Sequence, residues 1–402
     1  MGSRTFHSLR AYPDFRALWL GTVGTMLAQW VQFVAQGYLV FQLTHSPFQV
    51  GAVGFVRGIA ALVGAPVAGS ITDRFSRRSV LIVATGLLAA TGSLLALLVV
   101  LDAISVWVLY VTAAADGLIE SVNQPARQVM VYDVVGSEDL PNAVAVNSLG
   151  SNTMRIAGPA IGGGLIGAFG VEAAFTLQAV AYLGAMLATM RIRARGAPAG
   201  RASATLFQSI GEGIAYASGH RDVLLVIVMA GLPSLLVYPY VQYLPVFAED
   251  VLDVGSVGFG FLASAVGYGS IIGAVIAANL TGLRKRGQIV VWTTFAYMVL
   301  ITGFALSDMY ALSFALLVVA GIVNSTYLMF NQVMIQLMVD DEYRGRVLSL
   351  YVMTGSVTPF SALLMGALID VFGPQVTVAC YAGLASAIVL VIGLTSRRLR
   401  EI

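Results

Sequence analysis

The sequence predicts an all-α membrane protein in which twelve transmembrane helices form two parallel repeats of six. Three observations predict this fold: an apolar composition, recurring membrane-length apolar segments, and internal similarity between the two halves. Hydrophobic residues make up 58% of the 402 residues and charged residues only 10%, unlike an ordinary soluble domain. A helix needs about 20 mostly apolar residues to cross a bilayer, and the chain offers that length repeatedly.

The apolar segments expected to span the membrane are 15–42, 50–71, 79–101, 104–127, 143–168, 173–190, 222–247, 257–280, 289–306, 311–336, 346–369 and 376–395. The first follows Arg4, Arg10 and Arg16, as the apolar part of a signal peptide would. Its apolar run is too long for a signal peptide, and no cleavage site of small residues closes it. We therefore expect a retained helix.

The distribution of charge predicts the orientation. Of the 22 Lys and Arg residues, all but Arg57 and Arg155 lie at the N-terminus, after even-numbered segments, or in the C-terminal tail. The other loops carry acidic residues instead. The positive-inside rule then predicts a multi-pass protein of the inner membrane with both termini in the cytoplasm. The single cysteine, Cys380, excludes an intrachain disulfide and a paired-cysteine metal site.

A stretch rich in arginine, glycine and small residues, 191–218, is expected to be a cytoplasmic linker. It separates an N-terminal bundle, 1–190, from a C-terminal bundle, 219–402. Within the linker, Leu206–Tyr216 is expected to form a short surface helix.

The two halves resemble each other in sequence. Gly64–Val80 matches Gly273–Ile289, and Gly163–Gly170 matches Gly366–Gly373. Both matches give corresponding helices the same direction, which predicts parallel repeats about an axis along the membrane normal. Chance similarity between Gly/Ala-rich helices is the alternative, and two matches in the same order argue against it.

Polar side chains recur at helical spacing in every third segment, starting with the first. A spacing of three or four residues places them on one helix face, and polar groups facing lipid are costly. These faces are expected to line a central aqueous cavity, although hydrogen bonding between helices is an alternative role. The candidate substrate-binding residues are Gln29, Gln32, Gln36, Tyr238, Gln242, Asn324, Tyr327 and Asn331.

Charges inside the membrane occur only in the first half. Asp116 is expected near mid-depth, paired with Arg155 or Arg57, and Glu120 lies one helical turn away on the same face. A carboxyl group between apolar surroundings, a second carboxyl and an arginine can take up and release a proton. These four residues are therefore the candidate proton-coupling residues, with Glu120 favoured because no arginine is obviously dedicated to it. The alternative is a permanently charged structural network.

The segment "GSITDRFSRR" resembles the signature between the second and third helices of the major facilitator superfamily. The resemblance implies that the acid closes a cytoplasmic latch between the two bundles. Ser76 replaces the family's usual glycine, and Gly282 replaces the acid in the second repeat. The implied latch residues are Gly69, Asp73, Arg74, Arg77, Arg78 and Arg127.

A second motif, Gly158-Pro159-Ala-Ile-Gly162-Gly163, resembles part of the antiporter signature of drug:proton exporters, with Met154 in place of an earlier glycine. The stretches "NQPARQ" and "EDLPNAVAVNSL" are similar to the branch of macrolide-efflux and enterobactin-exporter-like proteins. The glycines also suit close packing of two helices, a reading compatible with the first.

These features favour a monomeric, proton-coupled exporter of amphipathic small molecules, drug-like or siderophore-like, with membrane lipids around it and no cofactor or nucleic acid. An enzyme is not expected, since His7, His45 and His220 lie in different loops and the only lysine, Lys285, is in no phosphate-binding loop. The alternatives are a lipid or lysolipid flippase, a proton-coupled importer of the same fold, and a receptor without transport.

Overall fold

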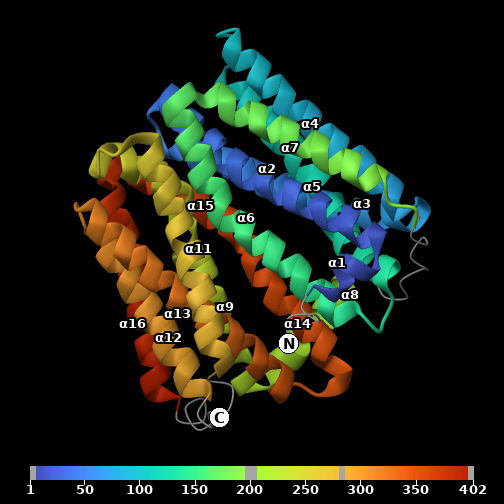
Figure 1. Cartoon of the computed structure of the whole chain (residues 1–402). Helices are drawn as coiled ribbons and strands as arrows, with labels where there is room; N and C mark the ends of the chain where they lie inside the picture. The colour runs from blue at the N-terminus through green and yellow to red at the C-terminus, as the bar shows by residue number, and fades with distance from the viewer. Residues whose placement is uncertain (1–5, 195–205, 280–285, 397–402) are drawn as a thin grey trace. The chain divides into compact units, whose positions relative to one another are not determined.

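The computed structural model describes residues 6–194, 206–279 and 286–396. This part of the chain is built from helices and contains no strand (Figure 1). Contacts divide the chain into two compact units. Unit 1 comprises Met1–His45, Val56–Ala202 and Gly255–Ser264, and unit 2 comprises Ser46–Phe55, Ser203–Val254 and Ala265–Ile402.

Unit 1 contains α1 His7–Ala11, α2 Pro13–Thr44, most of α3 Pro47–Arg74, α4 Arg77–Val100, α5 Val106–Val135, α6 Leu140–Phe169 and α7 Val171–Met190. Unit 2 contains α8 Leu206–Gly219, α9 Arg221–Leu236, α10 Leu244–Val246, most of α11 Gly255–Asn279, α12 Arg286–Ala305, α13 Tyr310–Met338, α14 Asp341–Met353, α15 Thr358–Phe372 and α16 Pro374–Thr395. The helices α3 and α11 each pass from one unit into the other. The division of the chain at 190 and 219 stays a prediction.

The predicted apolar segments all fall on helical parts of the chain, as an all-α membrane fold requires. Among the described residues, nine helical segments are long and apolar enough to cross a membrane. The helices α2, α5 and α6, which carry the polar and charged residues of the first half, are not in that set. The predicted surface helix forms as α8 and ends at Gly219 rather than Tyr216.

Two predicted segments are interrupted. The segment predicted as 222–247 breaks after α9, and a 3₁₀ turn, Tyr238–Tyr243, and a π-helical turn, Phe247–Val251, follow. Pro239 and Pro245 lie in this stretch, and a proline removes the backbone N–H that continues a helix. The segment predicted as 346–369 similarly contains a 3₁₀ turn, Thr354–Val357, just before Pro359.

The helices α4, α7, α12 and α16, which correspond to the third, sixth, ninth and twelfth predicted segments, expose large apolar side chains. Two polar residues on these helices, Thr85 on α4 and Gln178 on α7, are fully buried. The exposed side chains include Val83, Leu87 and Leu97 on α4, Val180, Leu183 and Leu187 on α7, Trp292 and Val299 on α12, and Leu384, Val391 and Leu394 on α16. An apolar outer face and a polar inner face are what a helix at the lipid boundary needs.

The internal repeat is visible in the backbone. Gly170 ends α6 with φ 88° and Gly373 ends α15 with φ 81°. Their N–H groups donate to the carbonyl oxygens of Ile166 and Ile369, at 2.9 and 2.8 Å. These four residues correspond in the second sequence match, so both copies end their helix in the same way.

We predict that Gly373→Ala destabilises the protein by about 1–3 kcal/mol, because φ 81° with ψ 161° is a conformation open essentially to glycine alone. An added methyl group meets no atom within 4 Å, so the cost is conformational and not steric. Thermal unfolding in detergent measures it. The control, Gly383→Ala, also adds a methyl group in open space but within helix α16, and should be neutral or slightly stabilising. Equal unfolding temperatures for the two variants would contradict this account.

Candidate functional site: a charged network in unit 1

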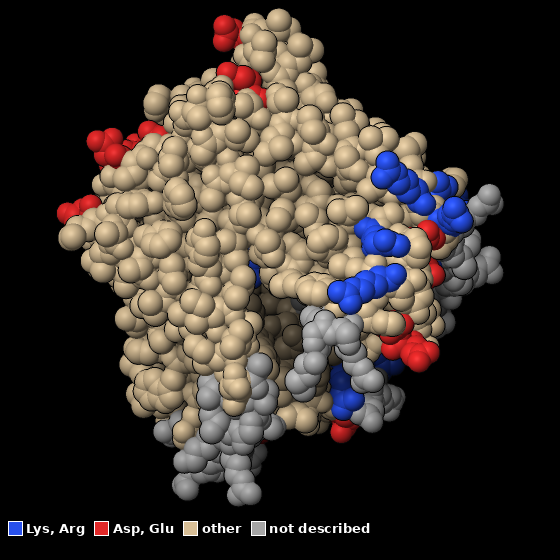
Figure 2. All heavy atoms as spheres, viewed as in Figure 1, with Lys and Arg blue, Asp and Glu red and all other residues tan. Residues whose placement is uncertain are grey.

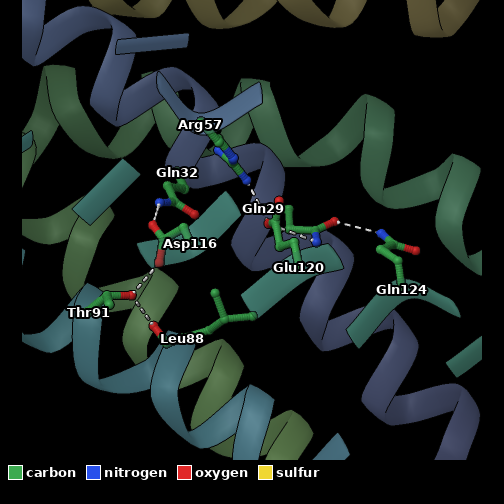
Figure 3. A network of polar contacts seen from close by, with 8 residues as sticks. All are labelled: Gln29, Gln32, Arg57, Leu88, Thr91, Asp116, Glu120 and Gln124. Carbon is green, nitrogen blue, oxygen red and sulfur yellow. Dashed lines mark hydrogen bonds and ion pairs between the residues drawn. The ribbon is translucent and has the colours of Figure 1, made fainter. Parts of the chain in front are cut away.

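A network of polar and charged side chains joins α2, α3, α4 and α5 inside unit 1 (Figure 3). At one end, the buried Asp116 carboxylate accepts hydrogen bonds from Gln32 Nε2 at 2.5 Å and Thr91 Oγ1 at 2.7 Å. At the other end, Arg57 Nη2 lies 2.6 Å from Glu120 Oε1, which also accepts a hydrogen bond from Gln29 Nε2 at 3.0 Å.

Helical spacing brings these groups together. Gln29 and Gln32 are three residues apart on α2, and Asp116 and Glu120 are four apart on α5, so each pair shares one helix face. The amide of each glutamine donates to one carboxylate across the helix contact. The polar face of α2 that the sequence indicated thus binds the acids of α5. Gln124 extends the network by donating to Gln29 Oε1 at 3.4 Å.

Gly117 allows α3 to approach α5 closely enough for this contact. A methyl group on Gly117 would overlap the carbonyl oxygen of Arg57. The second repeat has the same contact without the charge, because a methyl group on Gly321 of α13 would overlap the carbonyl oxygen of Val266. Small residues that let backbones meet are typical of packed membrane helices.

The sequence predicted that Asp116 pairs with Arg155 or Arg57, and the structure pairs Arg57 with the other acid. Arg57 pairs with Glu120, the acid for which no dedicated arginine was expected. The side chains of this pair are 23% and 17% exposed, whereas Asp116 is fully buried. Each charge inside a membrane costs about 2.5–3.5 kcal/mol on insertion scales, and pairing offsets part of this cost. Of the two acids, Glu120 is therefore the less buried.

Two further candidate arginines lie on α5 and α6. Arg155 is half-buried on α6, and its part in proton coupling stays a prediction. Arg127 is only 3% exposed. Its Nη2 lies 3.4 Å from Thr85 Oγ1 and 3.5 Å from Asn123 Oδ1, long contacts for a buried cation.

The candidate residues of unit 2 divide into two kinds. Tyr327 and Asn331 are buried and donate to backbone carbonyl oxygens of α9, both at 3.4 Å. These bonds join α13 to α9, which is the alternative role given above for polar residues in the membrane. Tyr238 instead donates to the side chain of Asn324 at 2.7 Å. Gln242 lies against α3 of the same unit, where a methyl group on Gly54 would overlap its amide oxygen. In unit 1, Gln36 donates to the carbonyl oxygen of Leu109 at 3.4 Å.

Two arginines of the charged turn after α3 bind groups at the ends of α5 and α7. Arg77 Nη1 donates to both carboxylate oxygens of Asp133, at 2.8 and 2.6 Å, and Arg78 Nη2 donates to the carbonyl oxygen of Met190 at 2.7 Å. Gly69 and Arg74 are exposed. The side chain of Asp73 lies outside the described part of the structure, so the latch stays a prediction.

The glycine motif on α6 lies at close helix contacts. Gly158 packs against Trp30 of α2, where a methyl group would come within 2.6 Å of the tryptophan Cβ, and Gly162 packs against Val31. Gly163 packs against Gly260, in the part of α11 that belongs to unit 1. The carbonyl oxygen of Pro159 lies 2.6 Å from where a methyl group on Gly260 would stand.

Sequence reasoning missed three participants in these contacts. Thr91 lies on α4, the third predicted segment, which is not among the segments predicted to carry a polar face, yet its hydroxyl donates to Asp116. Gln124 lies inside the predicted fourth segment and Asp133 lies after it. Neither was named as a candidate residue. A single threonine in an apolar helix gives no periodic signal. In the described parts of the chain, no group of three or more His, Cys, Asp or Glu side chains could hold a metal ion.

Comparisons with known proteins place the chain among membrane transporters. The family model described as "Transmembrane secretion effector" matches residues 4–401. The chain is 24% identical over 350 residues to the "Staphyloferrin A transporter" of Staphylococcus aureus, covering 86% of this chain and 87% of the relative. It is 25% identical over 388 residues to the "Enterobactin exporter EntS" of Shigella flexneri, covering 96% and 91%.

Solved transporter structures share the fold. The nucleoside transporter NupG superposes with a TM-score of 0.73 at 12% identity, covering 96% of this chain and 100% of that chain. A bacterial homologue of the human lysosomal transporter Spinster gives 0.68 at 15% identity, covering 96% and 95%. At these identities the likeness concerns the fold alone.

We predict that Arg57 and Glu120 are energetically coupled. Arg57→Gln leaves a carboxylate without its cation, and Glu120→Gln leaves the cation alone, so the double variant should lose less stability than the two single variants added together. The expected coupling is roughly 0.5–3 kcal/mol, measured by unfolding in detergent. Arg57→Gln with Asp133→Asn is the matched control, because Asp133 binds Arg77 instead, and should be additive. Additivity of Arg57→Gln and Glu120→Gln would argue against the pair.

Proposed function

Because the chain belongs to the transmembrane secretion effector family of the major facilitator superfamily, we propose that it is a proton-coupled exporter working by alternating access. It is a multi-pass membrane transporter and not an enzyme. The proposed substrates are amphipathic small molecules, drug-like or siderophore-like. Relatives named for staphyloferrin A and enterobactin support the second group.

The observation that carries the proposal is the state of Glu120. Its carboxylate is paired with Arg57, accepts a hydrogen bond from Gln29, and remains 17% exposed. A proton arriving there neutralises the carboxylate and removes the counter-charge of Arg57. The charged and the neutral form of Glu120 would thus hold α3 and α5 together with different strength. A coupling site needs such a difference, because a ligand shifts a conformational equilibrium only by binding the two states unequally.

Asp116 has a different part in this proposal. It is fully buried and held by Gln32 and Thr91, so it fixes α2, α4 and α5 beside the titrating acid. Uptake of a proton at Glu120 from outside would accompany release of substrate outward. Arg155 remains a candidate for the same step.

The proposed orientation places both termini in the cytoplasm, supported by the distribution of lysine and arginine. The turn containing Arg77 would then be cytoplasmic. Its ion pair with Asp133 joins α4 to the end of α5 and would hold that turn in place as the latch closes.

The alternatives make different predictions for flux. A lipid or lysolipid flippase would move its substrate without a pH gradient, a proton-coupled importer would move it in the opposite direction, and a receptor would show no flux. The ion-paired and partly exposed Glu120 favours proton coupling over the flippase and the receptor, and the relative named as an exporter favours export over import.

We predict that Glu120→Gln abolishes transport driven by a pH gradient, because the amide cannot take up the proton. The purified protein is reconstituted in proteoliposomes, a pH gradient is imposed, and flux of staphyloferrin A, enterobactin and a cationic dye is followed together with proton flux. Wild type should couple the two fluxes. The variant should fall to the level of protein-free vesicles while still exchanging substrate across the membrane without a gradient.

The comparison variant is Asp116→Asn, which should lower the rate through loss of a buried hydrogen bond but keep the coupling to protons. Retention of gradient-driven flux in Glu120→Gln would overturn the assignment of Glu120. Loss of coupling in Asp116→Asn alone would move the titrating site to Asp116.

A further inference from the structure

A basic pocket lies at the end of unit 1 where α2 begins and α7 ends. The pocket has a volume of about 670 Å³ and is lined by residues of both ends, among them Arg16, Leu20, Ala188, Arg191 and Arg193. In Figure 2, basic side chains gather at the right of the view, over the adjacent ends of α4 and α7, next to an uncharged face.

The pocket changes character along the helices. Arg16 and Leu20 are one turn apart on the same face of α2, and Ala188 and Arg191 have the same relation on α7. All three arginines that line the pocket are exposed, and Leu20 is 54% exposed one turn further into the membrane span. A ligand filling the pocket would therefore meet guanidinium groups at one end and apolar side chains at the other.

The wall of the pocket is fixed by backbone contacts. The Asp14 carboxylate accepts hydrogen bonds from the backbone N–H groups of Arg193 and Ala194, both at 2.9 Å, which ties the segment after α7 to the start of α2. Tyr12, also in the lining, donates to Asp139 at 2.8 Å, and the neighbouring carboxylate raises the pKa of its hydroxyl. These contacts fix the wall of the pocket and involve no arginine side chain.

The charges of the pocket do not balance. Three guanidinium groups face one carboxylate, Asp14, whose Oδ2 already binds two backbone N–H groups. The ion pairs His7–Asp139, Arg57–Glu120 and Arg77–Asp133 in the described part of the chain involve no arginine of the pocket. An excess of positive charge above an apolar floor at the membrane surface is complementary to an anionic head group with its acyl chains.

We propose that this pocket binds an anionic phospholipid of the surrounding membrane, with its phosphate on Arg16, Arg191 and Arg193 and its first acyl carbons against Leu20 and Ala188. Basic pockets between membrane helices at the lipid surface bind such head groups. The ligand seals the start of α2 to the end of α7, and so steadies the helix that carries Gln29 and Gln32. The proposal is independent of the substrate and of proton coupling.

The test uses the purified full-length protein and native mass spectrometry with phosphatidylglycerol or phosphatidylcholine of identical acyl chains. Wild type should retain phosphatidylglycerol in preference. Arg16→Gln and Arg193→Gln should each weaken its retention about fivefold, with no change for phosphatidylcholine. Both side chains are exposed, and the bonds of Asp14 are to backbone, so unfolding temperatures should stay unchanged.

Two controls and one competitor decide the outcome. Arg10→Gln and Arg74→Gln remove exposed arginines outside the pocket and should retain phosphatidylglycerol as wild type does. Arg16→Lys with Arg193→Lys keeps the charge and should retain most of the preference. Equal losses in the pocket and control variants would overturn the site. Displacement of the lipid by inorganic phosphate would assign the pocket to a soluble anion and overturn the proposal equally.

Discussion

The ion pair between Arg57 and Glu120 is the interaction on which the rest of unit 1 depends. Two opposite charges stand inside an apolar bundle, 2.6 Å apart, where each alone would cost about 2.5–3.5 kcal/mol. Their bond holds α3 to α5, and the amide of Gln29 extends it to α2. In the proposed mechanism, a proton on Glu120 would remove the counter-charge of Arg57 and so loosen the packing of three helices.

The backbone contact beneath this pair occurs in both repeats, whereas the charges occur in one. Gly117 lets α5 meet α3 at the Arg57 carbonyl, and Gly321 lets α13 meet α11 at the Val266 carbonyl. The same helix contact thus occurs in both repeats, with an arginine in one and a valine in the other. In each copy the contact supplies close packing, and only the first copy adds chemistry that a proton can change. The charged residues deep inside the predicted spans accordingly lie in the first half.

Much of the fold follows from local sequence signals, and the pairing within the site does not. Apolar length predicted the helices, and the sequence match that ends at Gly170 and Gly373 predicted parallel repeats, because both signals reside in short stretches. Periodicity also placed Asp116 and Glu120 on one face. It did not show which acid Arg57 reaches, since that depends on the rotation of α3 against α5. The hydroxyl of Thr91 was missed for a similar reason: one polar atom in an apolar helix has no period.

Infrared difference spectroscopy of the reconstituted protein tests the central claim most directly, because it detects the carbonyl band of a protonated carboxyl group. As the pH is lowered, wild type should gain such a band, Asp116→Asn should gain it as well, and Glu120→Gln should not. A band that persists unchanged in Glu120→Gln would contradict the account.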